Sequence, residues 1–322
     1  MKTIGVIIPN YNSGIYIKKC LDSLLEQEYK VNEIIVIDDC SIDESTKIVK
    51  EYIKKYNNII LLENEKNMGV SYSRNRGIET AKSDYIMFCD SDDWYEKQAV
   101  KKMMEKVEKD DADFVIAGYY ITYKDGRKIE VKYGNLKDKK ITKEISISYL
   151  PITSSSKLIK RSIFEKNNIK YPIGIKNCEE LPVIPVAGFW ANKVAYIDEC
   201  LYNYFQRGNS ASNHRLEDLS FYDITYEKFK NNLPEKYEMA IKVRMVEHLL
   251  YSKTYSLIKE KHSKKEILEN IEKCKKYLGK KDVEYILKDF PIRKRIFIKS
   301  SLYRFIFPLK IYVVLQQKMI GE

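Results

Sequence analysis

The chain has 322 residues, 44% hydrophobic and 32% charged, and carries a formal net charge of +11. This composition is typical of a soluble globular protein with room for one large or two modest domains. Its six cysteines show no paired spacing, which argues for a reducing compartment and against a zinc site or a disulfide framework. No signal segment is expected at the N-terminus, and no stretch approaches the ~20 apolar residues of a membrane span.

The first 120 residues alternate between short apolar runs and stretches with apolar residues at helical spacing. Strands are predicted at residues 3–9, 33–38, 58–63, 85–89 and 113–123, and helices at 17–25, 41–56, 71–81 and 98–109. Strands of β-branched residues separated by amphipathic helices indicate an α/β fold, with a mostly parallel sheet covered on both faces. In such sheets, ligands bind beyond the carboxyl ends of the strands.

The pattern changes after residue 123. Lys124–Arg127 is predicted to form a hairpin turn between strands at 119–123 and 128–133. Residues 134–215 mix helices and loops with one further strand at 194–204. From about residue 216 the chain is predicted to be helical, and it is rich in lysine and tyrosine there.

Acidic residues follow the fourth predicted strand, in the run Phe88-Cys89-Asp90-Ser91-Asp92-Asp93. Clustered carboxylates repel one another unless a cation neutralises them, and the Asp-x-Asp spacing places Asp90 and Asp92 on the same side of an extended backbone. This arrangement suits a hard divalent ion that keeps open positions for phosphate oxygens. The alternative is that Asp92 or Asp93 caps the next helix, because Asp93–Glu96 fits a capping box, as Ser41–Glu44 does earlier in the chain.

The strand ends belong to short motifs that follow one another in a fixed order. They are Val6–Asn12, Ile35–Asp43, Asn67–Gly77, Tyr85–Asp93, Ser156–Arg161, Glu179–Pro182 and Tyr202–Ser210. Together these motifs resemble the family 2 glycosyltransferases with a GT-A fold, over residues 1 to about 213. The resemblance implies a GT-A domain at 1–215, with a nucleotide-sugar-binding half at 1–120 and an acceptor-side half at 121–215. A helical, basic C-terminal region at 216–322 lies outside the resemblance.

Proteins of this family move a sugar from a nucleotide donor to an acceptor hydroxyl, usually with inversion at the anomeric carbon. By resemblance, the residues that bind the nucleotide-sugar are Pro9, Tyr11, Asp39, Gly69, Arg74, Asp90 and Ser91. The Tyr11 ring would stack on uracil, Asp39 would accept a hydrogen bond from the uracil N3–H, and Asp92 with Asp90 would hold Mn²⁺ or Mg²⁺. The alternatives are that Tyr11 covers the core at the end of a strand and that Asp38 caps a turn.

By the same resemblance, the base that takes the acceptor proton belongs to the pair Glu179-Glu180, at a position where the family pattern is usually Glu-Asp. Glu180 occupies the aspartate position, and its extra methylene moves the carboxylate by roughly 1.5 Å on a fixed backbone. Either the backbone is displaced to suit Glu180, or Glu179 serves, or the enzyme is slow. The structural alternative is that both acids start a helix, since Pro182 follows closely.

Three residues near the end of the resemblance have less definite roles. Arg207 and Ser210 match a family Arg-x-x-Ser element and would close over the donor phosphates or the acceptor. His214 is either a metal ligand or a solvated loop residue.

The resulting hypothesis is a metal-dependent, inverting glycosyltransferase that uses a UDP-sugar. It would act on a glycan or lipid-linked acceptor in surface polysaccharide synthesis, in the cytoplasm or peripherally on the inner face of the plasma membrane. The rivals are a sugar nucleotidyltransferase, whose glycine-rich phosphate loop is replaced here by Pro9–Asn12, and a non-catalytic sugar- or lipid-binding relative. No motif indicates a nucleic-acid partner, and no Gly-x-Gly-x-x-Gly supports a dehydrogenase.

The last segment, residues 290–322, mixes basic and apolar residues. Pro308 is expected to kink or break any helix there. A basic amphipathic stretch can lie in a membrane interface, so the segment is predicted to dock on anionic membranes. The alternatives are a helix packed on the protein's own core and a contact in a homodimer.

Overall fold

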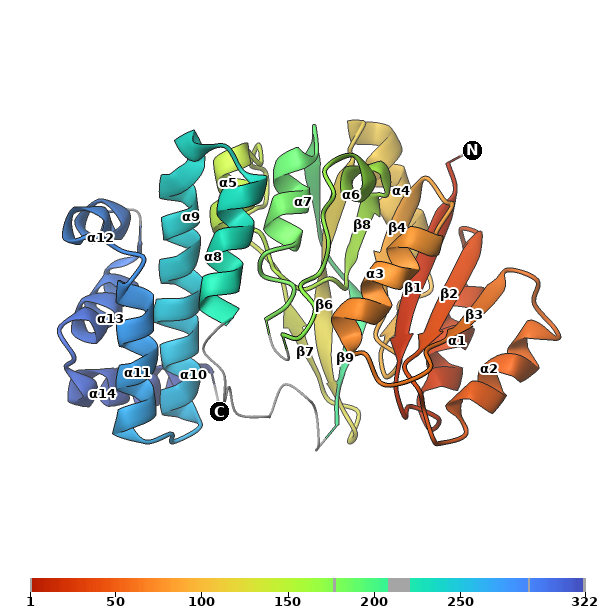
Figure 1. The fold of residues 1–322 in the computed structure, drawn as a ribbon, viewed down its shortest axis with the longest axis horizontal. Coiled ribbons are helices and arrows are strands. Elements are labelled where there is room, and N and C mark those ends of the chain that lie inside the picture. Colours follow the sequence, from red (N-terminus) through yellow and green to blue (C-terminus); the bar gives the residue numbers. More distant parts are fainter. Residues whose placement is uncertain (1, 176–177, 208–220, 289, 321–322) are drawn as a thin grey trace. The chain divides into compact units, whose positions relative to one another are not determined.

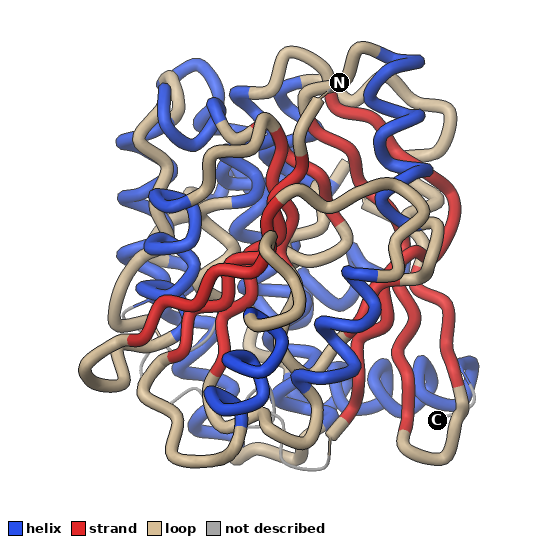
Figure 2. The backbone as a smooth tube through the Cα atoms, turned by 90° about the vertical axis from the view of Figure 1, so that its right-hand side faces the viewer, coloured by secondary structure: helices blue, strands red, loops and turns tan. Residues whose placement is uncertain are grey.

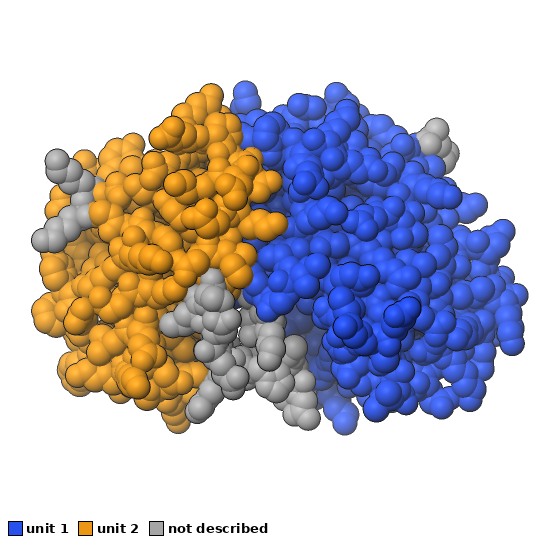
Figure 3. Space-filling model, in the orientation of Figure 1, with its two compact units in different colours: residues 1–146, 150–215 blue, residues 147–149, 216–322 orange. Residues whose placement is uncertain are grey.

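The computed structural model describes residues 2–175, 178–207, 221–288 and 290–320. The chain forms two compact units, coloured separately in Figure 3. The first contains residues Met1–Ser146 and Leu150–Arg215, and the second contains Ile147–Tyr149 and Leu216–Glu322.

The first unit is built on a nine-stranded sheet within the described residues. Its strands are β1 (Ile4–Asn10), β2 (Glu33–Asp38), β3 (Ile59–Glu63), β4 (Tyr85–Phe88), β5 (Trp94–Tyr95), β6 (Phe114–Tyr123), β7 (Lys128–Val131), β8 (Lys157–Lys160) and β9 (Val194–Gln206). The order is β3-β2-β1-β4-β8-β6-β9-β5, with β7 paired to β6. The first four strands are parallel, as predicted, whereas β8 runs antiparallel to both of its neighbours. Figure 2 shows the strong twist of the sheet.

Helices cover both faces of this sheet, which confirms the predicted α/β architecture (Figure 1). The helices of this unit are α1 (Ile17–Leu25), α2 (Ser45–Ile53), α3 (Val70–Thr80), α4 (Ala99–Asp110), α6 (Ser162–Lys166) and α7 (Ile184–Trp190). The helix α5 (Lys143–Tyr149) is shared, because its last three residues belong to the second unit. On β1, alternate residues such as Ile4, Val6 and Ile8 join one buried cluster with α1 and α4. The intervening residue Ile7 faces α3 instead, as the two-residue period of a strand requires.

Close packing of α3 on the sheet depends on a glycine. A Cβ atom at Gly77 would lie 2.4 Å from Ile7 Cγ2 and 3.0 Å from Ile37 Cδ1, so a larger residue would push the helix away from the sheet. Gly69, with a φ of +86°, allows the sharp entry into α3. Together the two glycines place Arg74 beyond the carboxyl ends of β1 and β2.

Both predicted capping boxes are wrong. The helix α2 begins at Ser45, whose backbone N–H donates to Asp43 at 3.0 Å, while the Ser41 hydroxyl accepts from the backbone N–H of Asn12 at 2.9 Å. Asp93 precedes the short strand β5, and α4 starts only at Ala99. The buried Asp93 carboxylate is used by β9 instead of a helix.

Two hydrogen bonds show how β9 uses this carboxylate. Asp93 accepts from the Tyr202 hydroxyl at 2.6 Å and from the backbone N–H of Phe205 at 2.7 Å. Burial and the charges of Asp92 and Asp90 raise the pKa of Asp93 well above its usual range. Asp93 therefore fastens the end of β4 to β9 and helps to fix the position of the residues before it.

The second unit is helical in its described residues, as the sequence predicts. Its elements are α8 (Phe221–Asn232), η2 (Glu235–Tyr237), α9 (Glu238–Arg244), the π-helix η3 (Met245–Ser252), α10 (Lys253–Lys259), α11 (Lys264–Lys275), α12 (Lys280–Leu287), α13 (Ile292–Leu302) and α14 (Ile306–Ile320). The buried Asn270 joins α11 to three of the others: it accepts from the Tyr222 hydroxyl of α8 and donates to Leu249 O of η3 at 3.2 Å and to Thr254 Oγ1 of α10 at 3.1 Å.

The predicted helix break does not occur at Pro308, which lies within α14. The chain turns at Arg304, which has a φ of +60°, and α14 then begins at Ile306. Pro308 lies in the first turn of α14, where backbone N–H groups have no partner within the helix and proline is tolerated. Within the part of the chain that the structure describes, no helix combines the length and apolar character needed to cross a membrane.

Candidate active site

A cavity of about 590 Å³ lies beyond the carboxyl ends of β1, β2 and β4 in the first unit. It gathers most of the site residues proposed from the sequence, namely Pro9, Tyr11, Asp39, Gly69, Arg74, Asp90, Ser91, Asp92, Glu179, Glu180 and Arg207. Tyr11 is 48% exposed, so the alternative that it covers the core is wrong. Ser210 and His214 lie outside the described residues.

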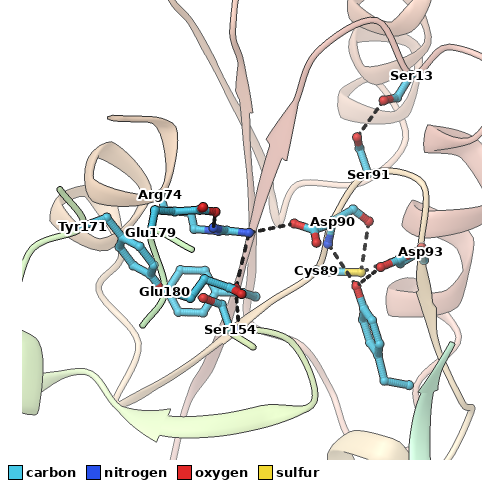
Figure 4. Close-up of polar contacts among 12 residues, drawn as sticks. Ser13, Arg74, Cys89, Asp90, Ser91, Asp93, Ser154, Tyr171, Glu179 and Glu180 are labelled. Carbon is cyan, nitrogen blue, oxygen red and sulfur yellow. Dashed lines mark hydrogen bonds and ion pairs between the residues drawn. The ribbon is translucent and has the colours of Figure 1, made fainter. Parts of the chain in front are cut away.

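Arg74 joins three of the acids in this cavity (Figure 4). Its Nη1 donates to Glu179 Oε1 at 2.7 Å, and its Nη2 lies 3.2 Å from Asp90 Oδ1 and 3.6 Å from Glu180 Oε1. Although burial opposes the charged form, Glu180, Asp90 and Glu179 raise the pKa of Arg74 well above its usual range. The Nε of Arg74 is also buried, with no hydrogen-bond partner in the described structure. Arg74 thus holds the end of β4 and the Glu179-Glu180 segment around one positive charge.

Glu179 and Glu180 lie in a turn and not at a helix start, so that alternative is wrong. The helix α7 begins at Ile184, and the backbone carbonyl of Glu180 accepts from Ile184 and Val183 N–H groups at 3.0 Å. The side chain of Glu180 accepts from the Ser154 backbone N–H at 2.5 Å. Burial raises the pKa of Glu180, although the charge of Arg74 opposes this. A carboxylate with a raised pKa, aimed into a cavity, has the properties of a general base.

Lys157 belongs to the Ser156–Arg161 motif, in which no site residue is predicted. This lysine is buried on β8, and its Nζ donates to Thr153 Oγ1 at 3.0 Å and to Ser155 O at 3.3 Å. Burial lowers the pKa of Lys157 to about 7, although the charge of Glu180 opposes the shift. Thr153 and Ser155 line the cavity, so Lys157 stabilises the cavity wall through its hydrogen bonds to these two residues. The sequence offers little signal for this burial, because β8 has a lysine at each end, Lys157 and Lys160.

Lys157 is expected to make stability rise with pH. Its pKa is about 7 in the folded protein and near the ordinary 10.5 when unfolded, so the unfolded state binds more protons between these values. Between pH 7 and pH 10, the unfolding free energy of the wild type minus that of Lys157→Met should rise by up to about 1.4 kcal/mol per pH unit. Urea titrations of both proteins across this range measure the difference. Parallel pH profiles would contradict the assignment.

Asp38 and Asp39 have different tasks although they are adjacent. Asp38 accepts from Asn10 Nδ2 at 2.7 Å and from the Ser41 backbone N–H at 3.0 Å, which is the turn-stabilising role considered as its alternative. Asp39 accepts from the backbone N–H groups of Met68 at 2.8 Å and Gly69 at 2.7 Å, and it lines the cavity. Asn64 Nδ2 also donates to Asp39 Oδ1 at 2.7 Å, so that oxygen has two donors, but Asp39 Oδ2 retains one acceptor position for a ligand donor.

The family model for glycosyl transferase family 2 matches residues 5–167. The chain belongs to this family. The match begins with β1 and extends past β8, and it includes the acids at the ends of β2 and β4. The family 2 resemblance inferred from the ordered motifs is therefore confirmed.

Two relatives and one crystal structure illustrate what this family 2 protein resembles. Glycosyltransferase GlyA of Streptococcus pneumoniae serotype 4 is 33% identical over 221 residues, covering 65% of this chain and 31% of GlyA. Poly(ribitol-phosphate) beta-glucosyltransferase of Bacillus spizizenii is 31% identical over 211 residues, covering 62% of this chain and 32% of that protein. The chain thus spans about a third of the length of these two curated relatives.

The crystal structure of S. aureus TarS 1–349 in complex with UDP-GlcNAc matches with a TM-score of 0.76 at 19% identity. The match covers 99% of this chain and 92% of that one. This likeness confirms the GT-A fold expected for the family 2 protein.

The acids at the end of β4 fit a divalent cation. Burial, and to a lesser extent the negative charge of Asp90, raises the pKa of Asp92, while Arg207, whose Nε lies 2.6 Å from Asp92 Oδ2, opposes this shift. Among the described residues, no three His, Cys, Asp or Glu side chains converge as a complete metal site. Mg²⁺ and similar hard ions are often held by one or two carboxylates with substrate phosphates completing the shell, so Asp92 and Asp90 suffice chemically.

Proposed function

We propose that this family 2 protein is a metal-dependent, inverting glycosyltransferase that transfers a sugar from a UDP-sugar to a hydroxyl group. The observation that carries the proposal is a single cavity that combines three acidic groups. They are Asp39, the pair Asp90 and Asp92 after β4, and Glu180, which lies near the same Arg74 Nη2 as Asp90. These are the groups that such a reaction needs: contacts for the base and diphosphate, and a carboxylate for the acceptor proton.

The nucleotide would bind between Tyr11 and Asp39. Tyr11 is exposed at the cavity and offers a ring face for stacking on uracil. Asp39 is held rigidly by the turn before α3 and can accept from the uracil N3–H, whereas cytosine offers no donor at that position. This difference supports a preference for uridine nucleotides.

Asp92, together with Asp90, would hold Mn²⁺ or Mg²⁺. A bound ion supplies positive charge that stabilises the departing diphosphate. Ser91 Oγ donates to Ser13 Oγ at 2.8 Å, and this bond orients the loop between the two acids. Arg207 would move from Asp92 to the donor phosphates once the nucleotide is present.

Glu180 would take the proton from the acceptor hydroxyl. The Ser154 N–H and Arg74 hold its carboxylate, and burial raises its pKa, which favours proton uptake. Attack of the deprotonated hydroxyl on the anomeric carbon, opposite the leaving diphosphate, inverts that carbon in one displacement. Glu179 would act through Arg74 as a positioning residue.

We further propose a glycan or lipid-linked acceptor in cell-surface polysaccharide synthesis. The similarity to a poly(ribitol-phosphate) beta-glucosyltransferase, named for a polymer acceptor, supports this class. With an acceptor of this class, the protein would catalyse the reaction in the cytoplasm, at the inner face of the plasma membrane. The division of the chain into a GT-A domain at 1–215 and a C-terminal region at 216–322 remains part of this proposal.

A thermal-shift panel tests the donor class. UDP-, GDP-, CMP- and dTDP-sugars are added with and without Mn²⁺, to the wild type and to Asp39→Ala. UDP-sugars with Mn²⁺ should raise the melting temperature most, and Asp39→Ala should reduce the advantage of uracil over the other bases. Equal shifts for all bases would contradict the nucleotide assignment. Binding without UDP release over a panel of acceptors would favour a non-catalytic relative.

A further inference from the structure

The helices α13 and α14 of the second unit combine positive charge with exposed apolar side chains. Residues 290–320 contain seven lysines and arginines and no aspartate or glutamate. Lys294 pairs with Glu247 at 2.5 Å and Arg304 with Glu272 at 2.9 Å, whereas the side chains of Lys299 and Lys310 are exposed. Since the whole chain of 322 residues has a net charge of only +11, positive charge is still concentrated in this segment. A local field of one sign attracts a partner of the opposite sign.

The helix α14 has two apolar faces. Leu309 and Val313 are buried within the unit, whereas Phe307, Ile311 and Leu315 are exposed, Phe307 by 75%. The exposed three recur every four residues and therefore form one stripe along the helix. Because the opposite face already packs α14 against its own unit, core packing does not account for the exposed stripe.

The same pattern extends to the preceding helix and turn. Ile292 and Ile296, one turn apart on α13, are both exposed. Between the two helices, Arg304 adopts its left-handed conformation, and its neighbours Tyr303 and Phe305 are exposed. We call the exposed apolar and basic side chains of residues 292–315 the α13–α14 surface.

We propose that the α13–α14 surface docks the protein on an anionic lipid bilayer. Lipid headgroups of negative charge complement the basic residues, and the exposed apolar side chains can enter the boundary between headgroups and acyl chains. A second copy of the chain would instead bring two positively charged surfaces together, which is unfavourable. Docking would bring the protein to a membrane that holds the lipid-linked acceptor. This inference rests on the membrane location proposed above and assigns that location to one surface of the chain.

Flotation with liposomes tests this surface without requiring sugar transfer. The full chain is mixed with phosphatidylglycerol-containing or pure phosphatidylcholine vesicles at low and high salt. The variants are Lys299→Glu/Lys310→Glu and Phe307→Ser/Ile311→Ser. The control is Ile42→Ser/Lys54→Glu, which alters an exposed apolar and an exposed basic residue of the first unit. Melting temperature and UDP binding, measured for every protein, verify folding and keep the donor proposal separate.

The wild type and the control should float with anionic vesicles at low salt, and flotation should fall by about fivefold or more at high salt. Both surface variants should lose flotation to a similar extent while keeping their melting temperature and UDP binding. Absent flotation of the wild type, equal flotation with neutral vesicles, or full flotation of both variants would overturn the proposal. Dimerisation in sedimentation that Phe307→Ser/Ile311→Ser abolishes, without flotation, would assign the surface to a second copy.

Discussion

Replacing Glu180 with glutamine is expected to lower sugar transfer by about 10²–10⁴-fold, because the variant cannot take the acceptor proton. Donor binding should change little. Glutamine keeps an oxygen that can accept from the Ser154 backbone N–H, so the turn before α7 should remain intact. Release of UDP from the donor selected by thermal shift, over a panel of acceptors, measures transfer, and calorimetry with UDP measures binding.

Glu179→Gln is the matched comparison. It removes a carboxylate that contacts Arg74 at 2.7 Å but leaves Glu180 in place, so it should weaken transfer less than Glu180→Gln. Transfer that persists in Glu180→Gln and disappears in Glu179→Gln would assign the base to Glu179. In the wild type, kcat/KM should fall as pH drops through the raised pKa of Glu180, and this acidic limb should lie above the ordinary glutamate value.

The parts of the site that the sequence predicts are those carried by local pattern. A buried strand that ends in polar residues can be recognised from a few neighbouring positions, and parallel strands bring such ends to one edge. This pattern indicates a site at the acids that follow β2 and β4, and the family 2 resemblance adds Tyr11 and the individual roles of Asp39 and Asp92. All three line the cavity. The helical character of the second unit was predictable for the same reason, since apolar spacing is a local property.

Features that depend on long-range contacts could not be predicted in this way. Asp93–Glu96 fits a helix cap locally, but Tyr202 and Phe205, more than one hundred positions away, take the Asp93 carboxylate. Arg74 acquires its role from Glu179, 105 positions later. The hydrogen-bond partners of Lys157, Thr153 and Ser155, are close in sequence, and it is the burial of this lysine that depends on the fold.

Asp92→Asn should remove the part of UDP affinity that depends on Mn²⁺. The wild type is expected to bind UDP about tenfold or more tightly with Mn²⁺ than with EDTA, since an ion held by Asp92 would supply positive charge to the phosphates. In Asp92→Asn the two affinities should converge, because a neutral amide is a weaker ligand for a hard cation. Titration calorimetry with UDP, in both buffers, measures the ratio. An unchanged ratio in the variant would exclude Asp92 as the ligand.

Asp92 also pairs with Arg207, so the loss of that ion pair must be separated from the loss of a metal ligand. Arg207→Gln breaks the same pair but leaves the Asp92 carboxylate in place. We expect it to weaken UDP binding in both buffers, because a positive charge near the phosphates is lost, while preserving the ratio between Mn²⁺ and EDTA. Loss of the ratio in both variants would mean that the ion pair itself organises the site. Loss in Asp92→Asn alone would leave metal ligation as the role of this carboxylate.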